Sequence, residues 1–103
     1  MQKEIKVSVI IRAYNAEGTI ERAVESVLMQ DFPRDSFEIV VVDDGSTDAT
    51  VERLGAYKSL AGFRLIRQSN KGAVPAANSG LREARGKYVV LLDSDDVLGP
   101  ELL

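Results

Sequence analysis

The chain has 103 residues, of which 45% are hydrophobic and 28% are charged, and its formal net charge is −3. This length fits one domain spanning residues 1–103, and the composition argues against both disorder and a membrane protein. Cysteine and histidine are absent, which excludes disulfides, thiolate metal sites and histidine acid-base chemistry, so any chemistry must rest on carboxylates and bound ions.

The distribution of charged and apolar residues limits the partners and the location. Lysine and arginine are scattered along the chain, so there is no basic patch for nucleic acid. No apolar run approaches the roughly 20 residues that span a bilayer, and the amino-terminal residues lead into a strand pattern rather than a signal peptide. We therefore expect a cytoplasmic protein with no nucleic-acid partner, and membrane association of a longer parent protein stays open.

The first part of the chain alternates between strand and helix patterns. Residues 7–11 are β-branched at four of five positions, which predicts a strand covered on both faces. Between residues 19 and 30 the apolar side chains recur at three- and four-residue spacing, which predicts an amphipathic helix that Pro33 terminates. Residues 37–42 are almost wholly apolar and predict a second strand that runs into Asp43 and Asp44.

A second helix is predicted next, capped by Ser46 or Thr47, with Val51, Leu54 and Tyr57 facing inward. Residues 63–66 predict a short third strand, and the polar turn 68–72 follows it.

The last part of the chain predicts a helix and a strand. The helix covers residues 74–84, with Ala77, Leu81 and Ala84 inward and Pro75 in its first turn. Residues 89–92 are four consecutive apolar residues and predict a buried strand. The alternation of strands and helices is typical of a parallel sheet wound by right-handed crossovers.

Ligands of such sheets bind outside the carboxyl ends of the strands. The four segments expected there are polar, and two of them carry paired carboxylates: residues 12–15, 43–48, 68–72 and 93–96.

Asp93, Asp95 and Asp96 place three carboxylates within four positions. Such groups repel one another, and they are tolerated either in solvent or where a divalent ion such as Mg²⁺ or Mn²⁺ neutralises them. An isolated Asp-x-Asp is more often a solvated turn, so the residues at the other strand ends decide how it is interpreted.

Two common nucleotide-binding motifs are missing from the sequence: the Gly-x-x-x-x-Gly-Lys-[Ser/Thr] loop that binds a triphosphate and the Gly-x-Gly-x-x-Gly turn that binds a dinucleotide. A Tyr-Asn turn and a Lys-Gly turn beside the acidic pairs suggest a site for a base, a ribose and a metal-bridged diphosphate.

Taken together and in order, these motifs resemble family 2 glycosyltransferases of the GT-A fold. The resemblance covers essentially the whole chain and rests on residues 7–15, 40–48, 70–78 and 91–96. It implies a three-layer α/β/α, Rossmann-like half-domain with a parallel four-stranded sheet of order 3-2-1-4. It also implies a donor domain that binds a nucleotide-diphosphate sugar, with uracil as the favoured base, for inverting transfer to an unknown acceptor.

The resemblance assigns roles to particular residues. Asp95 would coordinate Mg²⁺ or Mn²⁺ between the two phosphates, and Asp93 would reach the metal or the ribose. Tyr14 would pack beside the base, Asp44 would accept a hydrogen bond from its N3–H, and Asp43 would support that loop or bind the ribose. Lys71 and the start of the helix after Gly72 would contact phosphate. The full set of expected nucleotide-binding residues is Ala13, Tyr14, Asp43, Asp44, Lys71, Asp93 and Ser94.

The sequence departs from the family pattern at three places. Arg12 stands where the family usually has proline, and it would either loosen the Tyr14 turn or bind an anion. Ala77 stands where many members have arginine. In the family, the catalytic base and the acceptor-binding region lie downstream of the Asp-x-Asp motif. We therefore expect no catalytic residue in this chain and no sugar transfer by this chain alone. We also expect self-association through the face that the missing part leaves open.

Bland interpretations accompany these roles. Tyr14 alone fits a half-buried aromatic at a strand end, Asp48 fits a helix cap, and Lys71 and Arg12 fit solvated residues. A non-catalytic interaction module with a relict site is an alternative function. A phosphoacceptor signalling domain is a weaker one, because its paired acids should follow the first strand.

Overall fold

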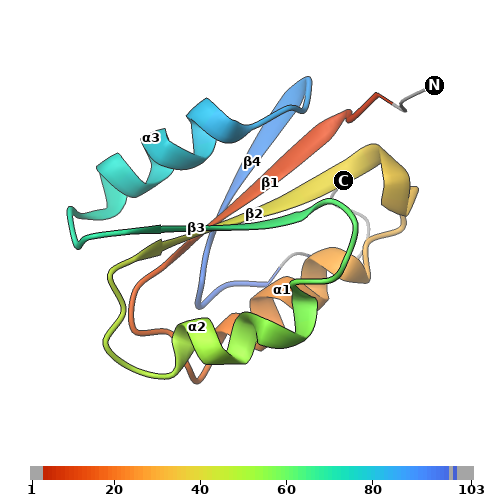
Figure 1. Ribbon diagram of the computed structural model, residues 1–103. Helices are drawn as coiled ribbons and strands as arrows, with labels where there is room; N and C mark the ends of the chain where they lie inside the picture. The colour runs from red at the N-terminus through yellow and green to blue at the C-terminus, as the bar shows by residue number, and fades with distance from the viewer. Residues whose placement is uncertain (1–3, 98, 100–103) are drawn as a thin grey trace.

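The computed structural model describes residues 4–97 and residue 99. Four strands form one parallel sheet in the order β3-β2-β1-β4, which confirms the predicted order (Figure 1). The strands are β1 Val7–Ala13, β2 Phe37–Asp44, β3 Phe63–Gln68 and β4 Tyr88–Asp93. Both central strands are longer than predicted, so Ala13, Asp43 and Asp44 belong to strand ends rather than to loops.

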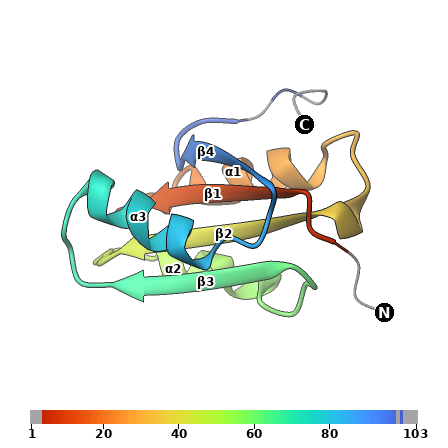
Figure 2. The same ribbon diagram turned by 90° about the horizontal axis from the view of Figure 1, so that it is seen from above.

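Helices cover both faces of the sheet. Helix α1 (Ile20–Leu28) and helix α2 (Thr50–Arg53), which continues as the 3-10 turn η2 (Leu54–Tyr57), lie on one face, and α3 (Ala73–Glu83) lies on the other (Figures 1 and 2). A short 3-10 turn, η1 (Arg34–Ser36), precedes β2. The predicted three-layer α/β/α architecture is confirmed. No helix in the described part of the chain is long and apolar enough to cross a membrane.

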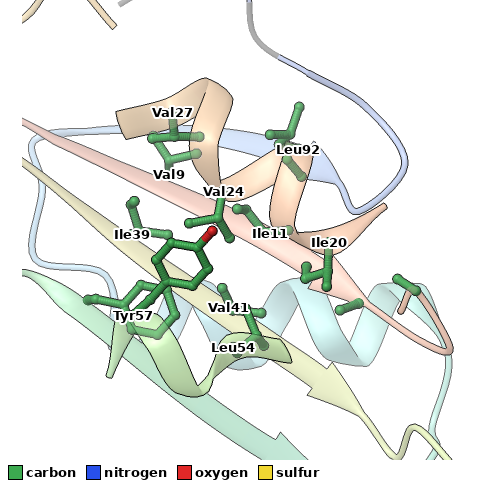
Figure 3. Packing of buried hydrophobic residues seen from close by; sticks show 14 of the residues in the cluster. Val9, Ile11, Ile20, Val24, Val27, Ile39, Val41, Leu54, Tyr57 and Leu92 are labelled. Carbon is green, nitrogen blue, oxygen red and sulfur yellow. The ribbon is translucent and has the colours of Figure 1, made fainter. Parts of the chain in front are cut away.

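The larger core lies between the sheet and the α1–α2 layer. Alternate residues of β1 and β2 point to this face because side chains alternate along a strand. They pack against the apolar stripe of α1 and against Leu54 and Tyr57 of η2 (Figure 3). The intervening residues Ile10, Val40 and Val42 form a smaller core under α3. Every residue of β2 is buried and only Arg12 of β1 is partly exposed, as predicted for strands covered on both faces.

Helix α3 packs through smaller residues than predicted. Ala77 is buried and Ala84 is partly buried, as expected, but Leu81 is 44% exposed, so its inward placement was wrong. Gly80 takes the inward position, where an added Cβ would come within 2.5 Å of Ile10 Cγ2. The helix axis lies so close to the sheet that only small side chains fit beneath it.

Strand β4 is less buried than predicted. Leu92 is 6% exposed, whereas Tyr88 is 67% exposed and Leu91 is 47% exposed. The prediction of a buried strand was wrong for most of β4, because β4 is the edge strand and pairs with β1 alone in the described structure. Self-association through an open face stays a prediction, and the exposed apolar residues of β4 are where it would act.

The start of α2 also differs from the prediction. Neither Ser46 nor Thr47 caps the helix, because α2 begins at Thr50 and Ala49 occupies the N-cap position. Ser46 Oγ instead accepts a hydrogen bond from the N–H of Asn15, and the N–H of Thr47 donates to Asn15 Oδ1. Asp48 accepts a hydrogen bond from the N–H of Thr50 at 2.9 Å, which matches the alternative that Asp48 stabilises this turn. Of the three predicted inward residues, Leu54 and Tyr57 are buried and Val51 is half-buried.

Candidate functional site

Segments from all four strand ends surround one hollow of about 630 Å³ at the carboxyl edge of the sheet. This volume lies in the range of small-molecule sites, roughly 300–1,000 Å³. The residues that line it are Arg12, Ala13, Tyr14, Asn15, Ala16, Thr19, Asp44, Asn70, Gly72, Ala73, Ala76, Asp93, Ser94 and Asp95. The parallel topology accounts for this assembly, since the carboxyl ends of all four strands meet at one edge.

Asp44 holds the β3–α3 loop against the end of β2. One carboxylate oxygen accepts hydrogen bonds from Gln68 Nε2 and from the N–H of Lys71, and the other accepts from the N–H of Gly72, each at 2.8 Å. The side chain of Asn70 donates to the Asp44 carbonyl oxygen. Asp44 is only 5% exposed but lines the hollow, so it presents an acceptor whose position is already set.

These contacts decide the ionisation of Asp44. Burial alone would raise its pKa, but the hydrogen bonds from Gln68, Lys71 and Gly72 outweigh burial and hold the pKa below the ordinary value of 3.8. The carboxylate is therefore charged at neutral pH, because the donors favour the ionised form.

Asp43 supports its own loop. It is fully buried and accepts hydrogen bonds from the N–H of Ser46 at 3.2 Å and from Ser46 Oγ at 2.5 Å. Ser46 Oγ in turn accepts from the N–H of Asn15, whose φ of 48° bends the chain after β1. This chain of contacts joins the β1 and β2 loops, which is the supporting role proposed for Asp43 as one of two possibilities.

Tyr14 lies at the rim of the hollow and is 51% exposed. Ala13, which precedes it, is buried and contributes part of the floor. An exposed aromatic side chain beside a polar hollow can pack against a flat ring such as a base.

Asp93, the last residue of β4, forms an open acidic cluster with Asp95 and Asp96 of the following loop. All three are exposed, and one carboxylate oxygen from each lies within 4.8 Å of those of the other two. Hard divalent cations bind through carboxylate oxygens, so this donor set fits Mg²⁺ or Mn²⁺. Asp93 and Asp95 also line the hollow, which would bring a bound ion beside any ligand in it.

Arg12 pairs with Asp93 across the β1–β4 ladder. The strand register sets the two residues opposite each other, and Arg12 Nη2 donates to Asp93 Oδ1. Sequence analysis expected Arg12 to bind an anion or to be solvated, and it did not predict this ion pair with Asp93. Strand pairing was the missing information, because the two residues are far apart in sequence.

The structure brings together most of the predicted site residues. Those that line the hollow are Ala13, Tyr14, Asp44, Asp93, Ser94 and Asp95. Asp43 and Lys71 are not among the lining residues: Asp43 is buried behind its loop, and Lys71 offers its backbone N–H to Asp44 while its side chain is exposed.

Sequence reasoning did not single out Thr19, Asn70 or Ala76, which also line the hollow. Asn70 lies in the polar turn already assigned to this edge, so its position was within reach of sequence analysis. Ala76 carried no such signal, because a small apolar residue in a helix looks the same whether it faces a core or a ligand.

Comparison with known proteins finds the same fold in related enzymes. The protein TarS of Staphylococcus aureus (strain Mu50 / ATCC 700699), a poly(ribitol-phosphate) beta-N-acetylglucosaminyltransferase, is 37% identical over 101 residues, covering 96% of this chain and 18% of that protein. The crystal structure of S. aureus TarS 1-349 in complex with UDP-GlcNAc superposes with a TM-score of 0.88 at 37% identity, covering 93% of this chain and 28% of that one.

A second solved structure adds a metal. The mannosyltransferase PcManGT from Pyrobaculum calidifontis, in complex with GDP-Man and Mn²⁺, superposes with a TM-score of 0.81 at 35% identity, covering 92% of this chain and 29% of that one. The chain therefore spans less than a third of the length of each of these relatives.

The sheet order, the helical layers and the hollow at the strand ends define a domain of the GT-A class, as in TarS. The model of Glycosyl transferase family 2 matches residues 8–103. The chain belongs to glycosyltransferase family 2 and corresponds to its amino-terminal part.

Proposed function

We propose that this domain binds the donor of a glycosyltransferase, a UDP-sugar held with Mg²⁺ or Mn²⁺. The observation that carries the proposal is the placement of Asp95 and Asp93 in the same hollow as Asp44 and Tyr14. One hollow thus offers a cation site, a pre-positioned hydrogen-bond acceptor and an exposed aromatic side chain. Similarity to a relative solved with UDP-GlcNAc supports UDP as the nucleotide.

Each group has a task in this proposal. Tyr14 packs beside the uracil, and Asp44, kept charged by its backbone donors, accepts from the base N3–H. Ala13 and Ser94 shape the walls, and Asp43 keeps the β2 loop closed through Ser46. Gly72 and Ala73 bring the amino-terminal end of α3 to the hollow, where helix N–H groups favour phosphate. The Lys71 side chain can reach phosphate only by turning toward the hollow.

Asp95, with Asp93 and Asp96 beside it, is the proposed holder of the ion. A bound divalent cation supplies electrostatic stabilisation of the charge that develops on the departing diphosphate. Because the chain corresponds to 28% of the TarS structure, complete sugar transfer in this proposal also uses the part of the enzyme that those relatives have in addition. In this proposal, the choice of acceptor therefore depends on that additional part.

The test is calorimetric titration of UDP into the chain, first with Mn²⁺ and then with EDTA. We expect binding that requires the metal and that weakens at least about tenfold in Asp95→Ala, because a carboxylate ligand is lost. Asp31→Ala is the matched control, since Asp31 is exposed and lies outside the hollow. GDP in place of UDP tests the choice of base. A folded chain that binds no nucleotide under any of these conditions would overturn the proposal and favour the relict interaction module.

The phosphoacceptor alternative has lost its support. Family membership points elsewhere, and β1 ends in Arg12 and Ala13, with no carboxylate to accept a phosphoryl group.

A further inference from the structure

The ion pair between Arg12 and Asp93 lies in the wall of the hollow, next to the acidic cluster. Both residues line the hollow together with Asp95. Strand pairing sets Arg12 opposite Asp93, so the backbone of β1 and β4 holds the guanidinium beside the cluster. The carbonyl oxygen of Arg12 also accepts a hydrogen bond from the N–H of Ser94 at 3.1 Å, which extends the connection into the acidic loop.

We propose that Arg12 is a resident counter-cation that couples metal binding to nucleotide binding in this site. The inference rests on the proposed donor site and adds a regulator to it. With the hollow empty, Arg12 neutralises Asp93 and lowers the attraction of the cluster for a free cation. With a nucleotide diphosphate present, the phosphates offer Arg12 a second partner, and Asp93 becomes available to the metal.

Charge is the first argument. Asp93, Asp95 and Asp96 carry three negative charges whose oxygens lie within 4.8 Å of one another, and Arg12 is the cation paired with one of them. A free divalent ion must therefore compete with a guanidinium for Asp93. Because the two side chains are 26% and 52% exposed, solvent screens the pair only in part, and the competition affects measured affinity.

The second argument is that the hydrogen bonding of Arg12 is incomplete. A guanidinium has five N–H donors and binds carboxylate or phosphate best through two of them. Within the described part of the chain, the Arg12 side chain donates one hydrogen bond, from Nη2 to Asp93 Oδ1. Among the residues that the structure describes, Arg12 Nε is the one buried side-chain nitrogen or oxygen that has no hydrogen-bond partner. Release from Asp93 therefore costs less than release from a two-point pair.

The third argument is the charge of the expected ligand. A diphosphate adds negative charge beside the cluster and attracts both the metal and Arg12, since guanidinium groups favour phosphate oxygens. If the nucleotide raises the affinity for metal by freeing Asp93, the metal must raise the affinity for nucleotide by the same factor. Arg12 then disfavours occupation of the site by metal alone.

The experiment measures Mn²⁺ binding alone, at low ionic strength, in the wild-type chain and in Arg12→Met. Methionine keeps much of the length of the side chain and removes the charge. We expect Mn²⁺ to bind about tenfold more tightly to Arg12→Met, because a competing unit charge next to Asp93 is gone. Arg82→Met is the control for net charge, since Arg82 is exposed in the last turn of α3, and it should match the wild type. Circular dichroism melts establish that each variant is folded. If Arg12→Met does not fold, Arg12→Gln takes its place.

A second arm repeats the Mn²⁺ titration with saturating UDP. The ratio of the Mn²⁺ dissociation constants without and with UDP should fall by about fivefold or more in Arg12→Met. Unchanged Mn²⁺ affinity and an unchanged ratio in a folded Arg12 variant would overturn this inference while leaving UDP binding, and hence the proposed function, in place. Absence of UDP binding in the wild-type chain would instead count against the proposed function. The titrations with Mn²⁺ alone would still test whether Arg12 competes with the metal for Asp93.

Discussion

Strands β2 and β4 both carry aspartates at or just after their carboxyl ends, yet the two groups of aspartates have opposite environments. Asp43 and Asp44 are buried, and donors from Ser46, Gln68 and the backbone occupy their oxygens. Asp95 and Asp96, like Asp93 before them, are exposed and crowd one another. The first group has its charges compensated within the protein, whereas the second leaves most of its charge for an external cation. The same residue type thus sets the shape of the site in one region and, in the function proposed above, holds the metal in the other.

The largest expected effect comes from Asp44→Ala. It removes the acceptor for Gln68 Nε2 and for the N–H groups of Lys71 and Gly72, and it leaves two backbone donors without partners. We expect a loss of about 3 kcal/mol in the free energy of unfolding, measured by urea denaturation. Asp95→Ala, the counterpart in the open loop, should change it by no more than about 0.5 kcal/mol. Equal losses in the two variants would remove the distinction between the loops.

An intermediate effect is expected from pH. The folded-state pKa of Asp44 lies below its ordinary value of 3.8 because the hydrogen bonds that it accepts outweigh burial. Its ionisation therefore stabilises the fold fully above the unfolded pKa, and this contribution is lost as pH falls through the folded pKa. Between about pH 5 and pH 2 the wild type should lose stability more steeply than Asp44→Asn, which cannot titrate at this position. Urea midpoints that fall in parallel for the two proteins would show that Asp44 contributes nothing to the pH dependence.

The smallest effect is expected in the open loop. Asp96→Asn removes one of three crowded charges but keeps the backbone hydrogen bond from residue 96 to the Asp93 carbonyl oxygen. We expect a gain of a few tenths of a kcal/mol at low salt that disappears at about 1 M salt, because exposed charges are screened. Thermal melts at both salt concentrations, with Asp31→Asn as the control, measure it. A loss of stability would mean that Asp96 has a structural role like that of Asp44.

The β4 end of the sheet also differs from the rest of the sheet in burial, because β4 is an edge strand. The α3 face of the sheet is close-packed around Gly80, whereas Tyr88 and Leu91 of β4 are largely exposed. The predicted order 3-2-1-4 placed the fourth strand at an edge, but its apolar run still predicted burial, because such a run looks the same at an edge and in the middle of a sheet. Burial depends on the number of neighbouring strands, which periodicity does not report.

The amino-acid sequence by itself determined the alternation of strands and helices, the parallel sheet and the edge at which the site lies. These follow from local patterns: apolar runs, three- and four-residue periodicity, and polar residues after strands. The tertiary structure alone decided that Gly80 rather than Leu81 faces the sheet, that Asp44 receives donors from the β3–α3 loop, and that Arg12 pairs with Asp93. Each of these depends on how closely two distant segments approach and in which register, and local sequence patterns carry no such information.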